Sequence, residues 1–208
     1  MTEHHSTFIH TQDGIDLEYV LGAAASPLGA IVLCHPHPEH GGTMRAPLIG
    51  AIAKRAVEAG VDVLRFNFRG VGTSTGSHGA GVAEIADITA AVDFMGNRDV
   101  PVIGIAGWSF GAATALRWQA ETGSDLAYVG IAPPVTSPLT PPLPHASELT
   151  PALRTIIVGQ RDQLIDVDEL ERYAESISAA ILRYETADHF FVFRHERLAD
   201  DVLGGFGI

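Results

Sequence analysis

Strand-like and helix-like segments alternate along most of the 208-residue chain, and this order constrains the fold more than any other feature. The continuous apolar run over 29–34 is typical of a strand that is buried on both faces, as in a parallel sheet. In 47–59, apolar residues recur at the spacing of an amphipathic helix. We expect two short strands in 8–21, further strands over 61–66, 102–106, 127–132, 154–158 and 181–184, and helices over 82–95, 110–121, 166–178 and beyond His189. This order predicts an α/β fold, with a mainly parallel central sheet and helices on both faces.

Length and charge narrow the classes of protein that need to be considered. The length is within the range of one domain, so we expect a single domain over residues 1–208. The net charge of −12 and the lack of a basic run argue against binding to nucleic acid or to an anionic membrane. The single cysteine, Cys34, cannot form an internal disulfide, and no segment has the pattern of a signal peptide or the length of a membrane span. These features predict a cytoplasmic protein, and we expect no cofactor.

The strongest local signal is the pentapeptide Gly107-Trp108-Ser109-Phe110-Gly111, which stands between a predicted strand and a predicted helix. In that position the pattern G-x-S-x-G forms a tight turn that exposes the serine hydroxyl in a strained backbone conformation. The following helix adds unpaired N–H groups and the positive end of its dipole. We therefore predict a catalytic nucleophile at Ser109. The alternative is a structural helix start with the serine as N-cap.

A serine nucleophile needs a base that takes its proton, and a third group that orients the base. In chains that carry this motif, an acid and then a histidine follow the serine. His189 comes just after the strand predicted over 181–184. By contrast, we expect His195 within a helix and His145 in a proline-rich loop. The sequence therefore predicts His189 as the general base.

The acid that orients the base is expected on the loop after the preceding strand. Asp162 lies on the loop that leaves the strand predicted over 154–158. Asp166 is a rival, but Glu169 follows it three residues later, and this pair is typical of a helix cap. Asp188 adjoins His189 in the sequence, which makes an approach to the imidazole ring awkward. We therefore predict Asp162 as the acid.

The negative oxygen that forms during acyl transfer needs two N–H donors, the oxyanion hole. One donor is expected from the residue after the nucleophile, Phe110, and the other from the loop after the strand over 29–34. Within Pro36-His37-Pro38 the only backbone N–H is that of His37, because proline has none. The flanking rings also restrict the backbone of His37. We predict His37 and Phe110 as the two donors.

Other residues are candidates for the walls of the site. We list Trp108, Gly41, Gly42 and Arg69 as candidate substrate-binding residues, and Trp108 can equally fill the core. Seven prolines fall between Ala132 and Arg154, in the connection between two predicted strands. Because proline breaks helices, we expect no helical cap domain and an open site.

Four motifs follow one another along the chain: His35-Pro-His-Pro38 with Gly41-Gly42, Arg65-Phe-Asn-Phe-Arg-Gly70, Gly107-Trp-Ser-Phe-Gly111 and Asp188-His189-Phe190. In combination they resemble a group of short bacterial α/β-hydrolases, which are described as predicted serine hydrolases or carboxylesterases. The resemblance covers nearly the whole chain from Gly29 onward. It implies the α/β-hydrolase fold and a triad of Ser109, Asp162 and His189, the residues that their positions also indicate.

The favoured interpretation is an enzyme that cleaves a small-molecule carboxylic ester through an acyl-enzyme intermediate. Cleavage of a thioester or an amide uses the same chemistry and stays open. A hypothesis with a different chemistry is a metal-dependent hydrolase. His35, His37, Glu39 and His40 lie close together in the sequence, and all are residue types that bind metals. Another is a binding protein without catalysis, since a fold does not imply a function.

Overall fold

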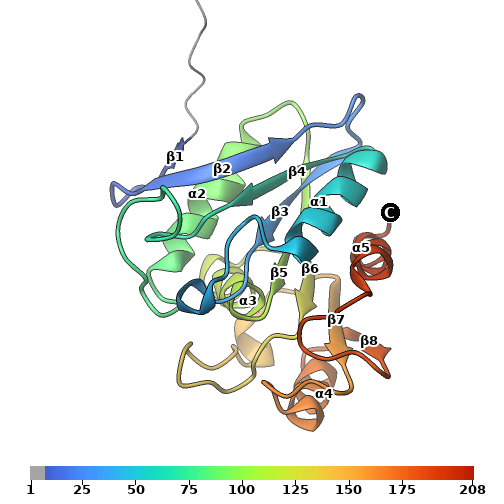
Figure 1. Ribbon diagram of the computed structural model, residues 1–208. Helices are drawn as coiled ribbons and strands as arrows, with labels where there is room; N and C mark the ends of the chain where they lie inside the picture. The colour runs from blue at the N-terminus through green and yellow to red at the C-terminus, as the bar shows by residue number, and fades with distance from the viewer. Residues whose placement is uncertain (1–7) are drawn as a thin grey trace, which may run out of the picture.

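The computed structural model describes residues 8–208, which form an eight-stranded sheet with helices on both sides (Figure 1). The strands are β1 (Phe8–His10), β2 (Asp16–Gly22), β3 (Gly29–Cys34), β4 (Val61–Phe66), β5 (Val102–Trp108), β6 (Ala127–Ile131), β7 (Arg154–Gly159) and β8 (Ala180–Tyr184). Their order in the sheet is β1-β2-β4-β3-β5-β6-β7-β8. β1 pairs antiparallel with β2, and β2 pairs antiparallel with β4, whereas all other pairs are parallel. The predicted mainly parallel sheet is confirmed.

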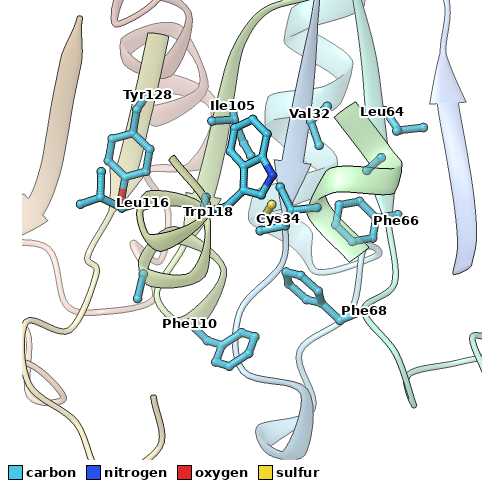
Figure 2. Close-up of a cluster of buried hydrophobic side chains, with 14 of the residues drawn as sticks. Val32, Cys34, Leu64, Phe66, Phe68, Ile105, Phe110, Leu116, Trp118 and Tyr128 are labelled. Atoms are coloured by element: carbon cyan, nitrogen blue, oxygen red, sulfur yellow. The ribbon is translucent and has the colours of Figure 1, made fainter. Parts of the chain in front are cut away.

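Two hydrophobic clusters fill the space between the sheet and its helices. On one face lie α1 (Pro47–Glu58) and α5 (His195–Gly204), and on the other lie α2 (Glu84–Gly96), α3 (Phe110–Thr122) and α4 (Val167–Ser176). In β3, Val32 and Cys34 belong to the cluster beside α2 and α3, whereas Ile31 and Leu33 belong to the other cluster. Figure 2 shows the first cluster, in which side chains from the sheet lie against α3. Because successive side chains of a strand point to opposite faces, the apolar run of β3 is buried on both.

Several element boundaries differ from the prediction by one to a few residues, and two of them have a clear structural cause. β5 extends to Trp108, because its last residues pair with β6, Trp108 lying opposite Ile131. Helix α2 begins at Glu84 rather than at residue 82. The Glu84 carboxylate accepts hydrogen bonds from the backbone N–H groups of Gly79 and Gly81, at 2.7 and 2.9 Å. The segment before Glu84 therefore forms a turn that is tied to the helix start.

The connection between β6 and β7 contains no α-helix, as its prolines predict. Its only helical element is a 3₁₀ turn at Ala146–Glu148. The sheet edge above the carboxyl ends of β5, β6 and β7 therefore has no helical cap domain over it. None of the helices formed by residues 8–208 combines the length and the apolar character that crossing a membrane requires.

Candidate active site

The predicted site residues follow the carboxyl ends of neighbouring parallel strands. Ser109 follows β5, and His37 lies on the loop after β3, which pairs with β5. Asp162 follows β7, and His189 follows β8, which pairs with β7. Parallel strands bring such loops to one edge of the sheet, where reactive groups collect in open α/β sheets.

Ser109 lies in the tight turn between β5 and α3 and has an unusual backbone conformation, with φ 54° and ψ −115°. Its N–H donates to the carbonyl of Ile131 at 2.7 Å, and its carbonyl accepts from Ala113 at 3.0 Å. The turn is tight because α3 starts against the end of β3. A Cβ atom added at Gly111 would lie 2.4 Å from the carbonyl oxygen of His35, so only glycine fits there. This is the predicted tight turn between strand and helix, called the elbow below, and the positive φ of Ser109 is the expected backbone strain.

The side chains of His189 and Asp162 form a buried pair. Nδ1 of His189 lies 2.7 Å from Oδ2 of Asp162, and the two side chains are 4% and 0% exposed. The other carboxylate oxygen, Oδ1, accepts from the backbone N–H groups of Leu164 and Ile165 at 2.8 and 3.2 Å. Both oxygens of Asp162 therefore have partners, and its orientation toward the imidazole is set.

Further hydrogen bonds hold the loop that carries His189. The N–H of Arg161 donates to the carbonyl of Ala187 at 2.9 Å, which joins this loop to the one that carries Asp162. The Trp108 indole N–H donates to the carbonyl of His189 at 3.2 Å, and the Trp108 side chain is buried. Trp108 is adjacent to Ser109 in the sequence, so this bond fixes the His189 loop to the elbow. Trp108 is thus a buried anchor for the site.

No hydrogen bond within residues 8–208 joins the Ser109 hydroxyl to the His189 ring. Hydrogen bonds between catalytic residues often tighten only when substrate binds.

The loop after β3 folds back on itself through its two glycines. Gly41 has φ 81° and ends the 3₁₀ turn Pro38–His40. The N–H of Gly42 donates to the carbonyl of His37 at 2.9 Å. A Cβ atom added at Gly42 would lie 2.1 Å from the carbonyl oxygen of Pro36. Both predicted substrate-binding glycines therefore have a clear role in shaping the loop that presents His37.

The structure brings the side chains of His37 and Phe110, the two predicted donor residues, into contact. The rings of His37 and Phe110 meet edge to face, with centroids 5.1 Å apart. In the described part of the chain, no carbonyl accepts a hydrogen bond from the backbone N–H of either residue. His37 has φ −53° and ψ 122°, the extended conformation expected between two prolines.

His35 does not join the metal-ligand group that the sequence suggested. Its Nε2 accepts from the backbone N–H of Phe68 at 3.1 Å, so Nδ1 carries the proton and donates to the carbonyl of Pro36 at 2.6 Å. Both ring nitrogens are used inside the protein. Instead, His78 from the loop before α2 lies beside His37, with ring centroids 5.0 Å apart. Sequence reasoning missed His78, because no local motif marks it.

The burial of His35 predicts an acid-sensitive contribution to stability. Burial lowers the pKa of His35 from 6.5 to about 4. As pH falls below about 6.5, the unfolded chain takes up a proton that the folded chain refuses, so the free energy of unfolding decreases until pH reaches about 4. The shift corresponds to about 3 kcal/mol. Urea unfolding of the wild type and of His35→Asn at pH 7 and pH 4.5 measures it: the variant is expected to be less stable at pH 7 and to lose less on acidification. Equal losses in both proteins would contradict the assignment.

Arg69, a predicted substrate-binding residue, has carboxylate partners within the protein. Its guanidinium donates to Oδ1 of Asp87 from Nε at 2.9 Å and from Nη2 at 2.7 Å, and to Oδ2 of Asp13 from Nη1 at 2.9 Å. The Arg69 side chain is 7% exposed, and that of Asp87 is fully buried. The guanidinium is therefore part of a buried ion network that ties the loop after β4 to α2. The network accounts for the position of the Arg69 guanidinium, and substrate binding by Arg69 stays a prediction.

Comparison with known proteins supports a hydrolase. No protein-family model matches the chain. The uncharacterized protein RP471 of Rickettsia prowazekii (strain Madrid E) is 32% identical, and the alignment covers 85% of this chain and 78% of that protein. An α/β serine hydrolase homologue from Coxiella burnetii superposes with a TM-score of 0.81 at 27% identity, over 98% of both chains. XC6422 from Xanthomonas campestris, a member of the α/β serine hydrolases without a lid, superposes with a TM-score of 0.78 at 28% identity, over 99% of this chain and 94% of that one.

These likenesses agree with the mainly parallel sheet and the surrounding helices described above. The neighbours in structure are α/β serine hydrolases, and the absence of a helical cap is shared with the protein from Xanthomonas campestris. The chain has the α/β-hydrolase fold, and it belongs to the same family as the uncharacterized protein RP471 of Rickettsia prowazekii.

Proposed function

We propose that this protein is a serine hydrolase that cleaves small-molecule carboxylic esters, with Ser109 as nucleophile, His189 as general base and Asp162 as the acid that orients the base. The observation that carries the proposal is the buried contact of 2.7 Å between His189 Nδ1 and Asp162 Oδ2. The Trp108 indole, one residue before the strained turn at Ser109, donates a hydrogen bond to the carbonyl of His189. A carboxylate on Nδ1 holds the proton at that nitrogen. Nε2 then keeps its lone pair and can accept the proton of the serine hydroxyl.

In the proposed reaction, His189 Nε2 takes the Ser109 proton while Oγ attacks the ester carbonyl carbon. The carbonyl oxygen becomes negative and accepts hydrogen bonds from the N–H groups of His37 and Phe110. When the C–O bond to the alcohol breaks, the imidazolium returns its proton to the leaving oxygen. The products of this half-reaction are a free alcohol and an acyl group on Ser109.

Water completes the cycle by the same route. His189 takes a proton from water, the resulting hydroxide attacks the acyl carbon, and the two N–H donors again stabilise the negative oxygen. The bond to Ser109 Oγ then breaks, and Oγ regains its proton from His189. A carboxylic acid leaves and the enzyme returns to its starting state.

The surroundings of the site favour substrates that reach it from solvent. No helical cap covers the sheet edge, and Phe190, which adjoins His189, is 50% exposed. The Phe190 ring packs edge to face against the buried Trp108 ring, with ring centroids 6.2 Å apart. The exposed Phe190 ring therefore forms an aromatic wall beside the base. Such a wall suits the apolar part of a small ester better than a charged group.

Labelling with a fluorophosphonate tests the proposal, because this reagent forms a stable adduct only with an activated serine. Intact mass is measured for the wild type, for Ser109→Ala and for Ser77→Ala, which removes an exposed serine in the nearby loop. We expect one adduct on the wild type and on Ser77→Ala, and none on Ser109→Ala. The same three proteins are assayed with short-chain nitrophenyl esters, for which turnover is expected to follow the adduct.

Two results would overturn this function. An adduct that persists in Ser109→Ala would assign the reactivity to another residue. A wild type that neither takes up the reagent nor hydrolyses any ester would favour a binding protein on the same fold.

A further inference from the structure

Histidines from two separate loops meet beside Phe110, the residue that follows Ser109. The rings of His37 and His40 stack with centroids 4.5 Å apart, and those of His37 and His78 lie 5.0 Å apart. One ligand atom each from His37, Glu39 and His78 lies within 4.8 Å of the other two. Two imidazoles and a carboxylate are a ligand set that binds Zn²⁺ in proteins, with a fourth position left for water.

Several nitrogens in this cluster lack hydrogen bonds although they are buried. Nε2 of His37 and both ring nitrogens of His78 have no hydrogen-bond partner among residues 8–208. The His37 residue is only 7% exposed, so water does not readily replace the missing partners. Leaving a buried polar group unsatisfied costs about 1–3 kcal/mol, and such groups are rare without a reason. A bound cation would use one such nitrogen from each of the two rings.

The buried carboxylate of Glu84 lies beside His78 Nδ1. Oε1 of Glu84 lies 2.9 Å from His78 Nδ1 without forming a hydrogen bond, and the Glu84 side chain is fully buried. The Glu84 oxygens also accept from Gly79 and Gly81, so the carboxylate is fixed in place. Metal-bound histidines usually have such a carboxylate at their other nitrogen, since it holds the ring and raises its basicity. With Nδ1 beside Glu84, Nε2 is the ring nitrogen of His78 that is left for a cation.

We propose that His37, Glu39 and His78 form a site for a divalent transition-metal cation such as Zn²⁺, and that the bound cation inhibits the enzyme. Inhibition rests on the proposed function, because it acts on the loop that supplies the His37 N–H donor. The Phe110 ring lies 5.1 Å from the His37 ring and 5.2 Å from the His78 ring, so the site adjoins both proposed donors.

Cation binding is expected to move the ring proton of His37, and this move would change the loop that carries His37. His37 Nδ1 accepts from the backbone N–H of Glu39 at 3.2 Å, so Nε2 carries the ring proton before a metal binds. Coordination through Nε2 needs that lone pair, so the proton moves to Nδ1 and the hydrogen bond from Glu39 is lost. The 3₁₀ turn Pro38–His40, which that bond caps, then has to rearrange beside the His37 N–H.

Zinc binding is measured directly on chelator-treated protein, by equilibrium dialysis and by the rise in melting temperature with added ZnCl₂. We expect one Zn²⁺ per wild-type chain. His78→Gln removes a ligand, and Glu84→Gln removes the carboxylate behind it; each is expected to weaken binding by about 10–100-fold or more. His4→Gln/His5→Gln is the matched control, since it removes the only two consecutive histidines in the sequence and should bind as the wild type does.

Ester hydrolysis is measured on the same proteins with a chelator and with zinc. The wild type is expected to be active in chelator and inhibited by Zn²⁺, whereas His78→Gln keeps its activity at the same Zn²⁺ concentration. Equal zinc affinity in the wild type, His78→Gln and Glu84→Gln would overturn the site, and loss of wild-type activity in chelator would overturn the inhibitory role. Zinc bound through this cluster in a protein that never hydrolyses esters would support the site and contradict the proposed function instead.

Discussion

Asp162→Asn is expected to lower kcat for ester hydrolysis by up to about 10⁴-fold, while the fold stays intact. The reason is the direction in which the new amide must point. Oδ1 of Asp162 accepts from the backbone N–H groups of Leu164 and Ile165, so the amide oxygen of the introduced asparagine would keep that place. Its NH₂ group would then face His189 Nδ1, where the carboxylate oxygen now lies at 2.7 Å.

An NH₂ group in that place can only donate, so His189 Nδ1 would have to accept. The ring proton would move to Nε2, and Nε2 would no longer be able to take the proton of Ser109. Flipping the amide would not help, because its NH₂ group would then meet two backbone N–H donors. The loss is therefore expected in kcat and not in substrate binding.

Asp166→Asn is the matched control for this experiment. Asp166 Oδ1 accepts from the N–H of Glu169 at 2.9 Å and caps helix α4, and asparagine is an equally good N-cap. This variant is expected to keep near wild-type kcat and stability. If Asp162→Asn also kept near wild-type kcat, Asp162 would not be the acid of the triad.

Arg69→Met is expected to lower the free energy of unfolding by about 3–5 kcal/mol, because it leaves a buried carboxylate without its counter-ion. The Asp87 side chain is fully buried and accepts from Arg69 through Nε, Nη2 and the backbone N–H. Only the backbone donor would remain in the variant. Urea unfolding measures the loss, with Lys54→Met as the control, since the Lys54–Glu58 pair is exposed and should contribute little.

The loss in Arg69→Met should depend on pH. Burial raises the pKa of Asp87 from 3.8 to about 6 even with the guanidinium beside it, and removing the guanidinium would raise it further. Protonation at pH 5 would then relieve the uncompensated charge, so the variant should lose less stability there than at pH 8. Adding Asp87→Asn should restore part of the loss at pH 8. A loss that is equal at both pH values, and that Asp87→Asn does not change, would show that the lost packing of Arg69 matters more than the charge.

The sequence was most informative where one local pattern decides the structure. Every residue of β3 is buried, so its apolar run marks both ends of the strand. Prediction was weaker where an individual pairing or hydrogen bond, rather than a repeating pattern, sets a boundary. Pairing with β6 lengthens β5 to Trp108, and the hydrogen bonds to the Glu84 carboxylate delay the start of α2. Periodicity carries no information about such contacts.

The same distinction holds for the site. Ser109, Asp162 and His189 follow strand ends, and the topology of a parallel sheet brings strand ends together, so their neighbourhood was predictable. Arg69 and His78 lie on loops whose partners come from elsewhere in the fold. Nothing in the sequence near Arg69 indicates that Asp87 and Asp13 use its donors. Likewise, nothing near His78 indicates that it lies beside His37.

The left-handed backbone at Ser109 also sets a limit on how stable this molecule can be. A non-glycine residue in such a conformation costs about 1–3 kcal/mol, and glycine would adopt the same φ of 54° with little strain. A chain chosen only for stability would therefore carry glycine at this position. Under the proposed function, replacing this serine would abolish catalysis, so stability and catalysis compete at this residue. Substitutions that raise the thermal stability therefore have to be made elsewhere in the fold.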